Sequence, residues 1–306
     1  MNWFQRITGF SEMSYKDTQA QLKTDGDYIV NIKTGKRYGM GKLEVISLAT
    51  LREQVGVLPK AFEPTPLIDL YGDIRSLHRA PDQRGALIQV ASQFNLLEMV
   101  SERVTPEHGV TNYAMDHTQG PACAMAAGAG TIYRNYLVPV EGGIGQTRDR
   151  QINTLADLEV ALGHQESPLW DWQNGYALCT ANGLARIRDR LANIDEKERD
   201  YLRGLLRVGL HWDVEITELG AEPNSRVTQV YCSAMPVGYG IRPVANWEPI
   251  ARLVLEAAYE ATLLAAVLNS YRGMSHRVLL TKIGGGVFGN NHEWITDAIG
   301  RALGLV

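Results

Sequence analysis

The chain has 306 residues, of which 45% are hydrophobic and 21% are charged, so it is long and apolar enough to bury a substantial core. Its 30 lysines and arginines and 34 aspartates and glutamates give a net charge of −4, which provides no overall basicity for binding nucleic acid or an anionic membrane. The three cysteines, Cys123, Cys179 and Cys232, are widely spaced in apolar surroundings, which indicates free thiols and predicts a cytoplasmic protein.

The N-terminal part, residues 1–60, predicts a small β-hairpin appendage. An apolar run at 27–32 is followed by a turn-like Lys-Thr-Gly-Lys at 33–36 and by a second apolar run at 43–46. After the Pro-Thr-Pro of residues 64–66 the pattern changes to strands that alternate with helices. We therefore expect residues 61–306 to form one layered α/β domain.

The elements expected in this domain follow from apolar runs and from helical spacing. Strands are predicted at 67–70, 86–91, 136–140, 208–217, 226–232 and 277–283, and helices at 121–133, 249–270 and 291–303. Residues 142–200 are predicted to form a helical insertion with two or three helical stretches. The helix at 121–133 is rich in alanine and glycine, which indicates close packing against a sheet or a ligand. Together these elements predict a mixed sheet between two layers of helices.

The most informative motif is the Gly-Gly-Gly-Val-Phe-Gly run at residues 284–289, between the last strand and the last helix. Glycine permits unusual backbone angles and lets backbone amides approach a phosphate, and a helix N-terminus adds a partial positive charge. The run matches G-x-G-x-x-G, but only 17 residues follow Gly289, too few for the second strand of a dinucleotide-binding fold. A tight turn that binds nothing is the alternative.

Three segments follow predicted strands: Gly72-Asp73-Ile74, the loop with Asn95, and the glycine run. In open α/β sheets, ligands gather beyond the carboxyl ends of the strands. These segments are joined by a small-residue helix, a strand that ends before Ser233, a long helix and a terminal strand, loop and helix. This order of elements resembles the macrodomain family, and the resemblance covers residues 67–140 and 208–306.

The resemblance implies a three-layer α/β/α macrodomain-like fold that binds ADP-ribose or a related NAD-derived nucleotide diphosphate. In that family the aspartate at the position of Asp73 holds the adenine amino group, and the late glycine loop surrounds the diphosphate, with Phe288 near the distal ribose. The ligand-binding residues expected in this way are Asp73, Ile74, Asn95, Gln119, Gly120, Ser233, Gly284, Gly285, Gly286, Val287, Phe288 and Gly289. A carboxylate suits an amine donor, and a loop of N–H donors suits a diphosphate.

The chain departs from the family in the first loop. The usual Asn-Ala-Ala-Asn motif is replaced by Ser92-Gln93-Phe94-Asn95, and the first glycine-rich loop by Thr118-Gln119-Gly120-Pro121. Neither the aspartate of hydrolytic members nor the paired glutamates of the poly(ADP-ribose) glycohydrolase subgroup occur in place. Three functions therefore stay open: hydrolysis of an ADP-ribosyl glycosidic linkage, non-catalytic sensing of ADP-ribosylated partners or NAD metabolites, and a vestigial pocket.

Asp116 is the candidate for catalysis, because it lies in the loop that would face the distal ribose. A carboxylate there can orient water toward an anomeric carbon, whose cleavage passes through an oxocarbenium-like transition state. The alternative is that Asp116 only caps the following helix or forms a turn. Glu98 and Glu141 are further carboxylates near strand ends.

Several classes of site and partner are disfavoured. The histidines and cysteines lack metal-binding spacing, so we expect no metal ion and no cofactor. Residues 1–10 lack the pattern of a secretory signal, and the apolar stretch 253–268 is too short for a membrane span and carries two glutamates. The tryptophans are scattered, unlike a stacking surface for single strands. The expected partners are ADP-ribose or a related small molecule, or an ADP-ribosylated macromolecule, but no membrane and no specific nucleic-acid sequence.

Overall fold

The computed structural model describes residues 1–59, 66–240 and 243–306. The predicted domain boundary at 60/61, with Pro64 and Thr65, lies outside the described residues.

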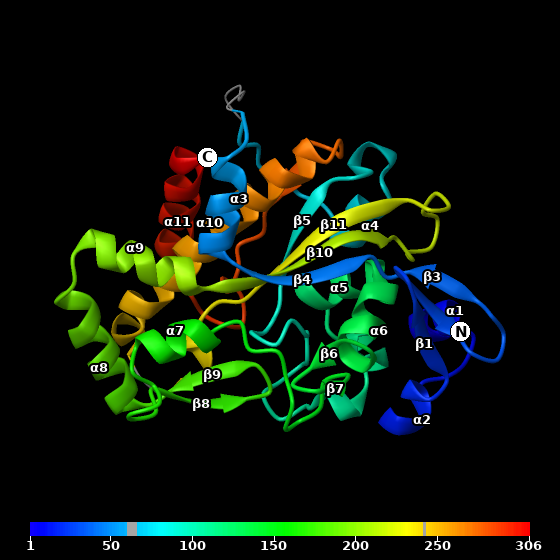
Figure 1. Cartoon of the computed structure of the whole chain (residues 1–306), viewed down its shortest axis with the longest axis horizontal. Coiled ribbons are helices and arrows are strands. Elements are labelled where there is room, and N and C mark those ends of the chain that lie inside the picture. The colour runs from blue at the N-terminus through cyan, green and yellow to red at the C-terminus, as the bar shows by residue number, and fades with distance from the viewer. Residues whose placement is uncertain (60–65, 241–242) are drawn as a thin grey trace.

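The protein is mixed α/β, built around a five-stranded sheet (Figure 1). Its elements are α1 (Trp3–Thr8), α2 (Tyr15–Gln19), β1 (Leu22–Asp25), β2 (Tyr28–Asn31), β3 (Arg37–Gly39), β4 (Lys42–Ser47), α3 (Leu48–Gly56), α4 (Ile74–Arg79), β5 (Leu87–Ala91), α5 (Gln119–Ala126), α6 (Gly128–Tyr136), β6 (Pro139–Val140), β7 (Gly143–Ile144), α7 (Ala156–Ala161), β8 (Trp170–Gln173), β9 (Tyr176–Cys179), α8 (Ala181–Ala192), α9 (Glu196–Leu205), β10 (Arg207–Glu215), β11 (Arg226–Cys232), α10 (Glu248–Tyr271), β12 (Val278–Leu279) and α11 (His292–Leu305).

The central sheet has the strand order β12-β5-β11-β10-β4. β5 runs parallel to both β11 and β12, whereas β10 is antiparallel to β11 and to β4. The sheet is therefore mixed, as predicted, and the strands expected at 86–91, 208–217 and 226–232 are confirmed. The carboxyl ends of β5, β11 and β12 meet at one edge, where the candidate site lies.

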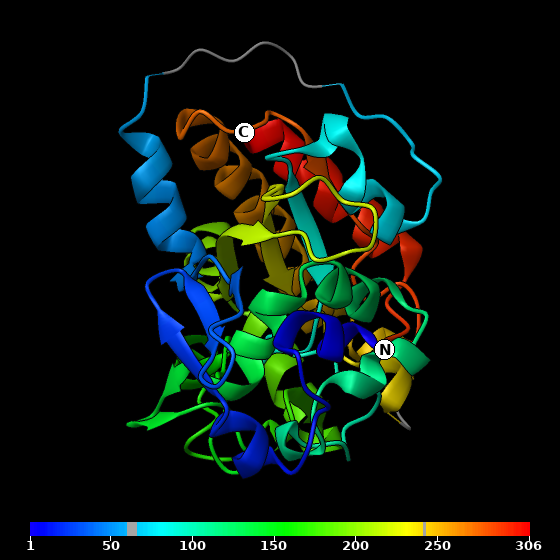
Figure 2. The ribbon, with the colours of Figure 1, turned by 90° about the vertical axis from the view of Figure 1, so that its right-hand side faces the viewer.

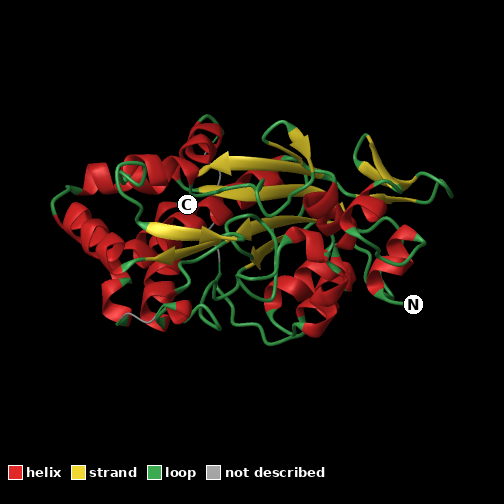
Figure 3. Ribbon diagram, turned by 90° about the horizontal axis from the view of Figure 1, so that it is seen from below, coloured by secondary structure: helices red, strands yellow, loops and turns green. Residues whose placement is uncertain are grey.

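Helices cover both faces of this sheet (Figure 3). Successive side chains of a strand point to opposite faces of the sheet. On one face, Leu87 and Val230 lie in the core shared with α10. Ile88 and Tyr231 point the other way and pack with Cys123 of α5. The helix α10 begins at Glu248 with proline in its first turn, where a missing N–H costs nothing, and it confirms the helix expected at 249–270.

The N-terminal residues do not form the predicted hairpin of runs 27–32 and 43–46. β2 pairs with β1 and β3 in a small separate sheet, while β4 pairs with β10 and forms one edge of the central sheet. The helix α1 packs against α6 through a second core that includes Phe4 (Figure 2). The prediction failed because the partner of β4 lies more than 160 residues further along the chain, and local turn signals carry no information on such a partner.

The predicted helix at 121–133 is divided into α5 and α6 at Ala127, whose backbone angles are φ −117° and ψ 53°. Its small residues permit close contacts: a Cβ on Gly128 would lie 2.4 Å from Ile7, and one on Gly130 would lie 2.9 Å from His211. The strand predicted at 136–140 is reduced to the two residues of β6, because α6 continues to Tyr136, and β6 pairs with β7 outside the central sheet.

Two further strand predictions differ from the structure. Residues 67–70 form no regular element, and their apolar side chains Leu67, Ile68 and Leu70 are exposed because no strand pairs with them. The strand expected at 277–283 is reduced to the two residues of β12. The terminal helix expected at 291–303 is confirmed as α11, with Asn291 as its N-cap.

The predicted insertion at 142–200 contains three helices, α7, α8 and α9, and in addition the hairpin β8–β9, which the sequence did not predict. This hairpin brings Tyr176 to the candidate site. Among the helices in the described residues, none combines the length and the hydropathy that crossing a bilayer requires.

Candidate functional site

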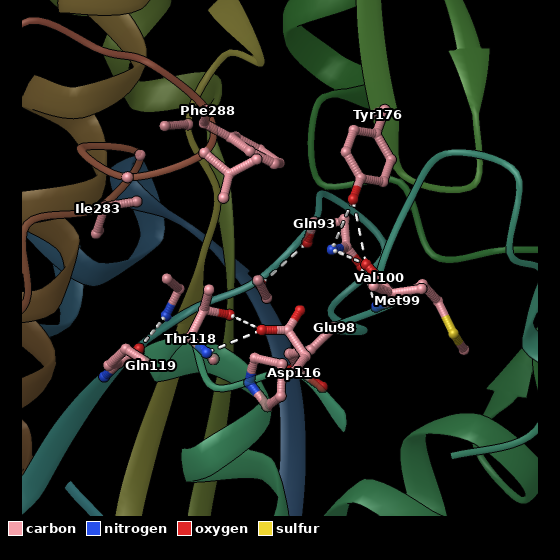
Figure 4. A pocket seen from close by; sticks show the side chains of 18 of the residues that line it. Gln93, Glu98, Met99, Val100, Asp116, Thr118, Gln119, Tyr176, Ile283 and Phe288 are labelled. Carbon is pink, nitrogen blue, oxygen red and sulfur yellow. Dashed lines mark hydrogen bonds between the residues drawn. The ribbon is translucent and has the colours of Figure 1, made fainter. Parts of the chain in front are cut away.

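A cavity of about 230 Å³ lies beyond the carboxyl ends of β5, β11 and β12 (Figure 4). Its walls come from the segments after these strands, the loop before α5, and β9. The lining residues are Ala91, Ser92, Gln93, Glu98, Met99, Val100, Asp116, Thr118, Gln119, Gly120, Pro121, Tyr176, Ala234, Tyr239, Ile283, Gly284, Gly286, Val287 and Phe288. The cavity thus brings the glycine run and Asp116 together from segments far apart in the sequence.

The floor of the cavity is the end of β5, which Gln119 completes. The side-chain amide of Gln119 donates to the carbonyl of Gln89 (2.8 Å) and accepts from the N–H of Ala91 (2.9 Å), in place of a neighbouring strand. A Cβ on Gly120 would lie 2.0 Å from the carbonyl oxygen of Ala91, so only glycine lets α5 begin this close to β5. Gln119 and Gly120 therefore line the cavity, but their polar role there is structural.

The glycine run is held in one conformation by its neighbours. Gly284 and Gly289 have φ values of +70° and +68°, in the left-handed region that favours glycine. The backbone N–H of Asn290 donates to the carbonyl of Gly284 (2.9 Å), and its side-chain amide donates to the carbonyl of Met235 (2.8 Å). A Cβ on Gly284 would also lie 2.5 Å from the methyl group of Ala234. Both the backbone angle and the packing thus require glycine at 284.

The backbone amides of the run fall into two groups. Those of Gly285 and Gly289 donate to carbonyls of the same segment, at 3.0 and 2.9 Å. Four others have no hydrogen-bond acceptor within the described residues: Gly284, Gly286, Val287 and Phe288. All four of these residues line the cavity. Unpaired N–H groups on one short loop form a concave donor surface of the kind that binds anions.

Three aromatic rings form another wall of the cavity. Tyr176, Tyr239 and Phe288 lie with ring centroids 5.1 to 5.6 Å apart in tilted and edge-on arrangements. The Tyr176 hydroxyl donates to the carbonyl of Met99 (3.2 Å) and accepts from the Gln93 side chain (3.3 Å), which fixes the ring. The sequence prediction missed both tyrosines, because nothing local links β9 to the glycine run.

Asp116 lies on the cavity wall, across from the aromatic rings (Figure 4). Its Oδ1 accepts hydrogen bonds from the N–H and the hydroxyl of Thr118, at 2.8 and 2.7 Å. This is the turn-forming role that the sequence analysis weighed as the alternative. Its Oδ2 has no hydrogen-bond partner within the described chain, so one carboxylate oxygen is left to meet a ligand or water.

Glu98 is the second carboxyl group of the cavity and is only 2% exposed. Burial raises its pKa to about 8, against the opposing effects of the Arg134 charge and of Tyr113. Its Oε1 lies 3.5 Å from the Arg134 guanidinium, and its Oε2 is buried without a partner among the described residues. Glu98 therefore holds a proton at neutral pH.

Arg134 does not depend on Glu98 for its hydrogen bonds. Its guanidinium donates to the carbonyl of Leu96 (2.9 Å) and to Thr131 Oγ1 (3.1 Å), and it lies 3.2 Å from His211 Nδ1. It also stacks on the Tyr231 ring at 3.6 Å. Burial lowers the pKa of His211 well below its usual value, with Arg134 acting in the same direction, so the imidazole is a neutral acceptor.

The structure does not bring the remaining predicted residues to the cavity. Asp73 is exposed and caps α4 through the N–H groups of Arg75 and Ser76, and the Ser76 hydroxyl lowers its pKa. Ile74, the first residue of α4, packs against the core on its face of the sheet. The Gly-Asp-Ile segment thus has a helix-capping role.

Asn95, Ser233, Gly285 and Gly289 are likewise absent from the lining. Asn95 is fully buried, where its side chain bonds to Gln151 and to the N–H of Leu97. The Ser233 hydroxyl donates to the carbonyl of Ala234 (3.3 Å). The side chains of Asn95 and Ser233 thus bond to neighbouring polar groups, and the backbone N–H groups of Gly285 and Gly289 bond to carbonyls of their own segment.

In the part of the chain that the structure describes, no three histidine, cysteine, aspartate or glutamate side chains are grouped as a metal site requires. Comparison of the chain with protein-family models, with curated proteins and with solved structures finds no match.

Proposed function

We propose that this cavity binds ADP-ribose or a related NAD-derived diphosphate through its phosphate groups. The observation that carries the proposal is a set of four backbone amides on the cavity wall that have no acceptor in the part of the chain that the structure describes: Gly284, Gly286, Val287 and Phe288. Such donors are fixed in place before a ligand arrives, and a hydrogen bond to a charged group contributes more than one between neutral groups. The loop conformation, fixed by Asn290, supplies the preorganisation.

The order of elements supports a macrodomain-like reading of the fold. β5, the small-residue helices, β11, the long α10 and the terminal β12, loop and α11 follow one another as in that family. Asp73 differs from the adenine-binding aspartate of that family, because it caps α4 and does not line the cavity. The cavity volume of about 230 Å³ is also below the usual range for sites that hold a whole ligand. We propose that it holds the phosphate and distal ribose, with the adenosine half outside.

Of hydrolysis and non-catalytic sensing, the two alternatives in which the cavity binds a ligand, hydrolysis has the stronger support. Asp116 presents one unpaired carboxylate oxygen, and Glu98 presents a carboxyl group, to the same cavity. Two carboxyl groups that flank the scissile bond are the machinery of glycosidic hydrolysis. Non-catalytic sensing would require only the loop amides. Turnover of an ADP-ribosylated peptide separates the two, and Asp116→Asn should reduce it at least about 100-fold.

Calorimetry with ADP-ribose, ribose 5-phosphate and ribose tests the binding. Val287→Pro removes one of the four N–H groups, and its control Val287→Ala keeps that N–H while shortening a side chain that is 64% exposed. The φ of Val287 is not positive, so proline fits the sign of its backbone angle. We expect Val287→Pro to weaken ADP-ribose at least about ten-fold and Val287→Ala by less than about three-fold. Absence of heat with both phosphorylated ligands at high micromolar concentration would exclude the proposal.

A further inference from the structure

A second, smaller cavity of about 110 Å³ adjoins the first and shares four residues with it. Its lining consists of Glu98, Met99, Val100, Val104, His108, Gly109, Asn112, Tyr113 and Asp116. Glu98, Met99, Val100 and Asp116 belong to both linings. The carboxyl groups of Glu98 and Asp116 therefore lie between the cavity lined by the glycine run, which we call the main cavity, and the smaller one, which we call the side cavity.

The side cavity differs from the main cavity in chemistry. The apolar side chains of Met99, Val100 and Val104 line it, and within residues 1–59, 66–240 and 243–306 no lysine or arginine does. The Tyr113 hydroxyl accepts a hydrogen bond from the N–H of Glu98 at 3.0 Å. The ring of His108 bonds to Thr105 through Nδ1. A site with apolar walls and no cationic side chain among its described residues favours an uncharged, mainly apolar group, and its volume limits that group to about one ring.

Glu98 is a buried polar group that the two cavities leave unsatisfied. Its Oε2 is buried and has no partner among the described residues, and the residue, which is 2% exposed, lines both cavities. An unpartnered buried carboxyl oxygen is costly in a folded protein and often marks a functional group. Arg134 finds its acceptors elsewhere, so the long 3.5 Å contact does not account for the position of Glu98.

We propose that a ribosyl substrate spans the two cavities, with its phosphate on the glycine run, its leaving group in the side cavity, and Glu98 as the proton donor to that leaving group. The leaving group is an uncharged, mainly apolar group of about one ring that departs through oxygen or nitrogen. This inference rests on the proposed function, because it requires the phosphate to occupy the main cavity.

The reaction is a hydrolysis, with water as the only co-reactant. The bond between the anomeric carbon and the leaving atom breaks, its electron pair stays on the leaving atom, and that atom takes the proton of Glu98. Water forms the new bond to the anomeric carbon and gives a proton to Asp116. Transfer of that proton to Glu98 through solvent restores both groups.

Two ribosides that carry a 5-phosphate test the role of Glu98. One has a 4-nitrophenyl aglycone, which departs without protonation, and the other has a benzyl aglycone, which departs only with a proton; both anomers of each are assayed. In Glu98→Gln, the ratio of kcat/KM for the 4-nitrophenyl over the benzyl substrate should rise at least about 100-fold. A loss that is equal for both substrates would show a structural role and overturn the proposal.

Val104→Phe, with Val104→Ile as its control, tests the side cavity. Filling the cavity should lower kcat/KM for both ribosides at least about ten-fold, while the affinity for ribose 5-phosphate changes less than about three-fold. If wild-type protein does not bind ribose 5-phosphate, the proposed function itself fails. If it binds ribose 5-phosphate but cleaves neither riboside, or if Val104→Phe cleaves both at the wild-type rate, only the further inference fails.

Discussion

Replacing Glu98 by glutamine should change how the stability of the protein depends on pH. Burial raises the pKa of Glu98 from 4.5 to about 8. Between these values the folded protein holds a proton that the unfolded chain releases, so the free energy of unfolding falls as the pH rises. The slope for one proton is about 1.4 kcal/mol per pH unit, which amounts to roughly 5 kcal/mol between pH 4.5 and pH 8.

Glutamine has nearly the shape of glutamic acid but does not titrate, so Glu98→Gln should lack this slope. Urea denaturation at about pH 5 and about pH 8 measures the effect as the difference between wild type and variant. Buried groups that both proteins share, such as His78 and His211, cancel in that difference. Relative to wild type, Glu98→Gln should be several kcal/mol more stable at the higher pH than at the lower.

A second variant controls for the loss of a carboxylate as such. Glu141 is exposed on the loop between β6 and β7, so Glu141→Gln should follow the wild-type dependence on pH. Equal slopes for wild type and Glu98→Gln would refute the reasoning, because they would mean that Glu98 is ionised in the folded protein and pairs with Arg134 across the 3.5 Å contact.

Two substitutions test the packing around the site and the core. Gly120→Ala should lower the free energy of unfolding by more than about 3 kcal/mol, since its methyl group would lie 2.0 Å from a backbone oxygen, whereas Gly300→Ala, with open space around it on α11, should stabilise by up to about 1 kcal/mol. Thermal unfolding compares the two, and equal melting temperatures would contradict the close approach. Glu260→Gln should lower the free energy of unfolding, measured by urea denaturation, by about 3 kcal/mol, because this buried carboxylate pairs with Arg52 and Arg301. A decrease below about 1 kcal/mol would mean that the ion pairs of Asp200 are sufficient for both arginines.

Local sequence patterns predicted the elements whose packing is uniform along their length. β5, β11 and the long apolar α10 are each largely buried along their length, so the residues of each element meet one kind of environment. The pattern failed where the partner is distant or absent. β4 belongs to the central sheet only because β10 lies beside it, and residues 67–70 are apolar but have no strand to pair with.

The candidate site was predictable in part for the same reason. The glycine run and Asp116 carry their chemistry in a few adjacent residues, and both line the cavity. Gln119 was expected to bind the ligand, but its side-chain amide forms hydrogen bonds with the backbone of β5. Asp73 was expected to hold adenine, but a carboxylate at a helix start is also a cap, and only the structure separates the two roles.

The two-residue length of β12 sets the shape of the whole site. Leu87 still donates to the chain of β12, at the carbonyl of Arg277, but two residues past Leu279 the N–H of Thr281 bonds only to the side chain of Gln89. The two strands separate at this point. The side-chain amide of Gln119 forms the hydrogen bonds that the edge of β5 would otherwise make with a strand or with water. A sequence change that extended the pairing of β12 with β5 by two residues would draw the glycine run toward β5. The cavity between them would then close.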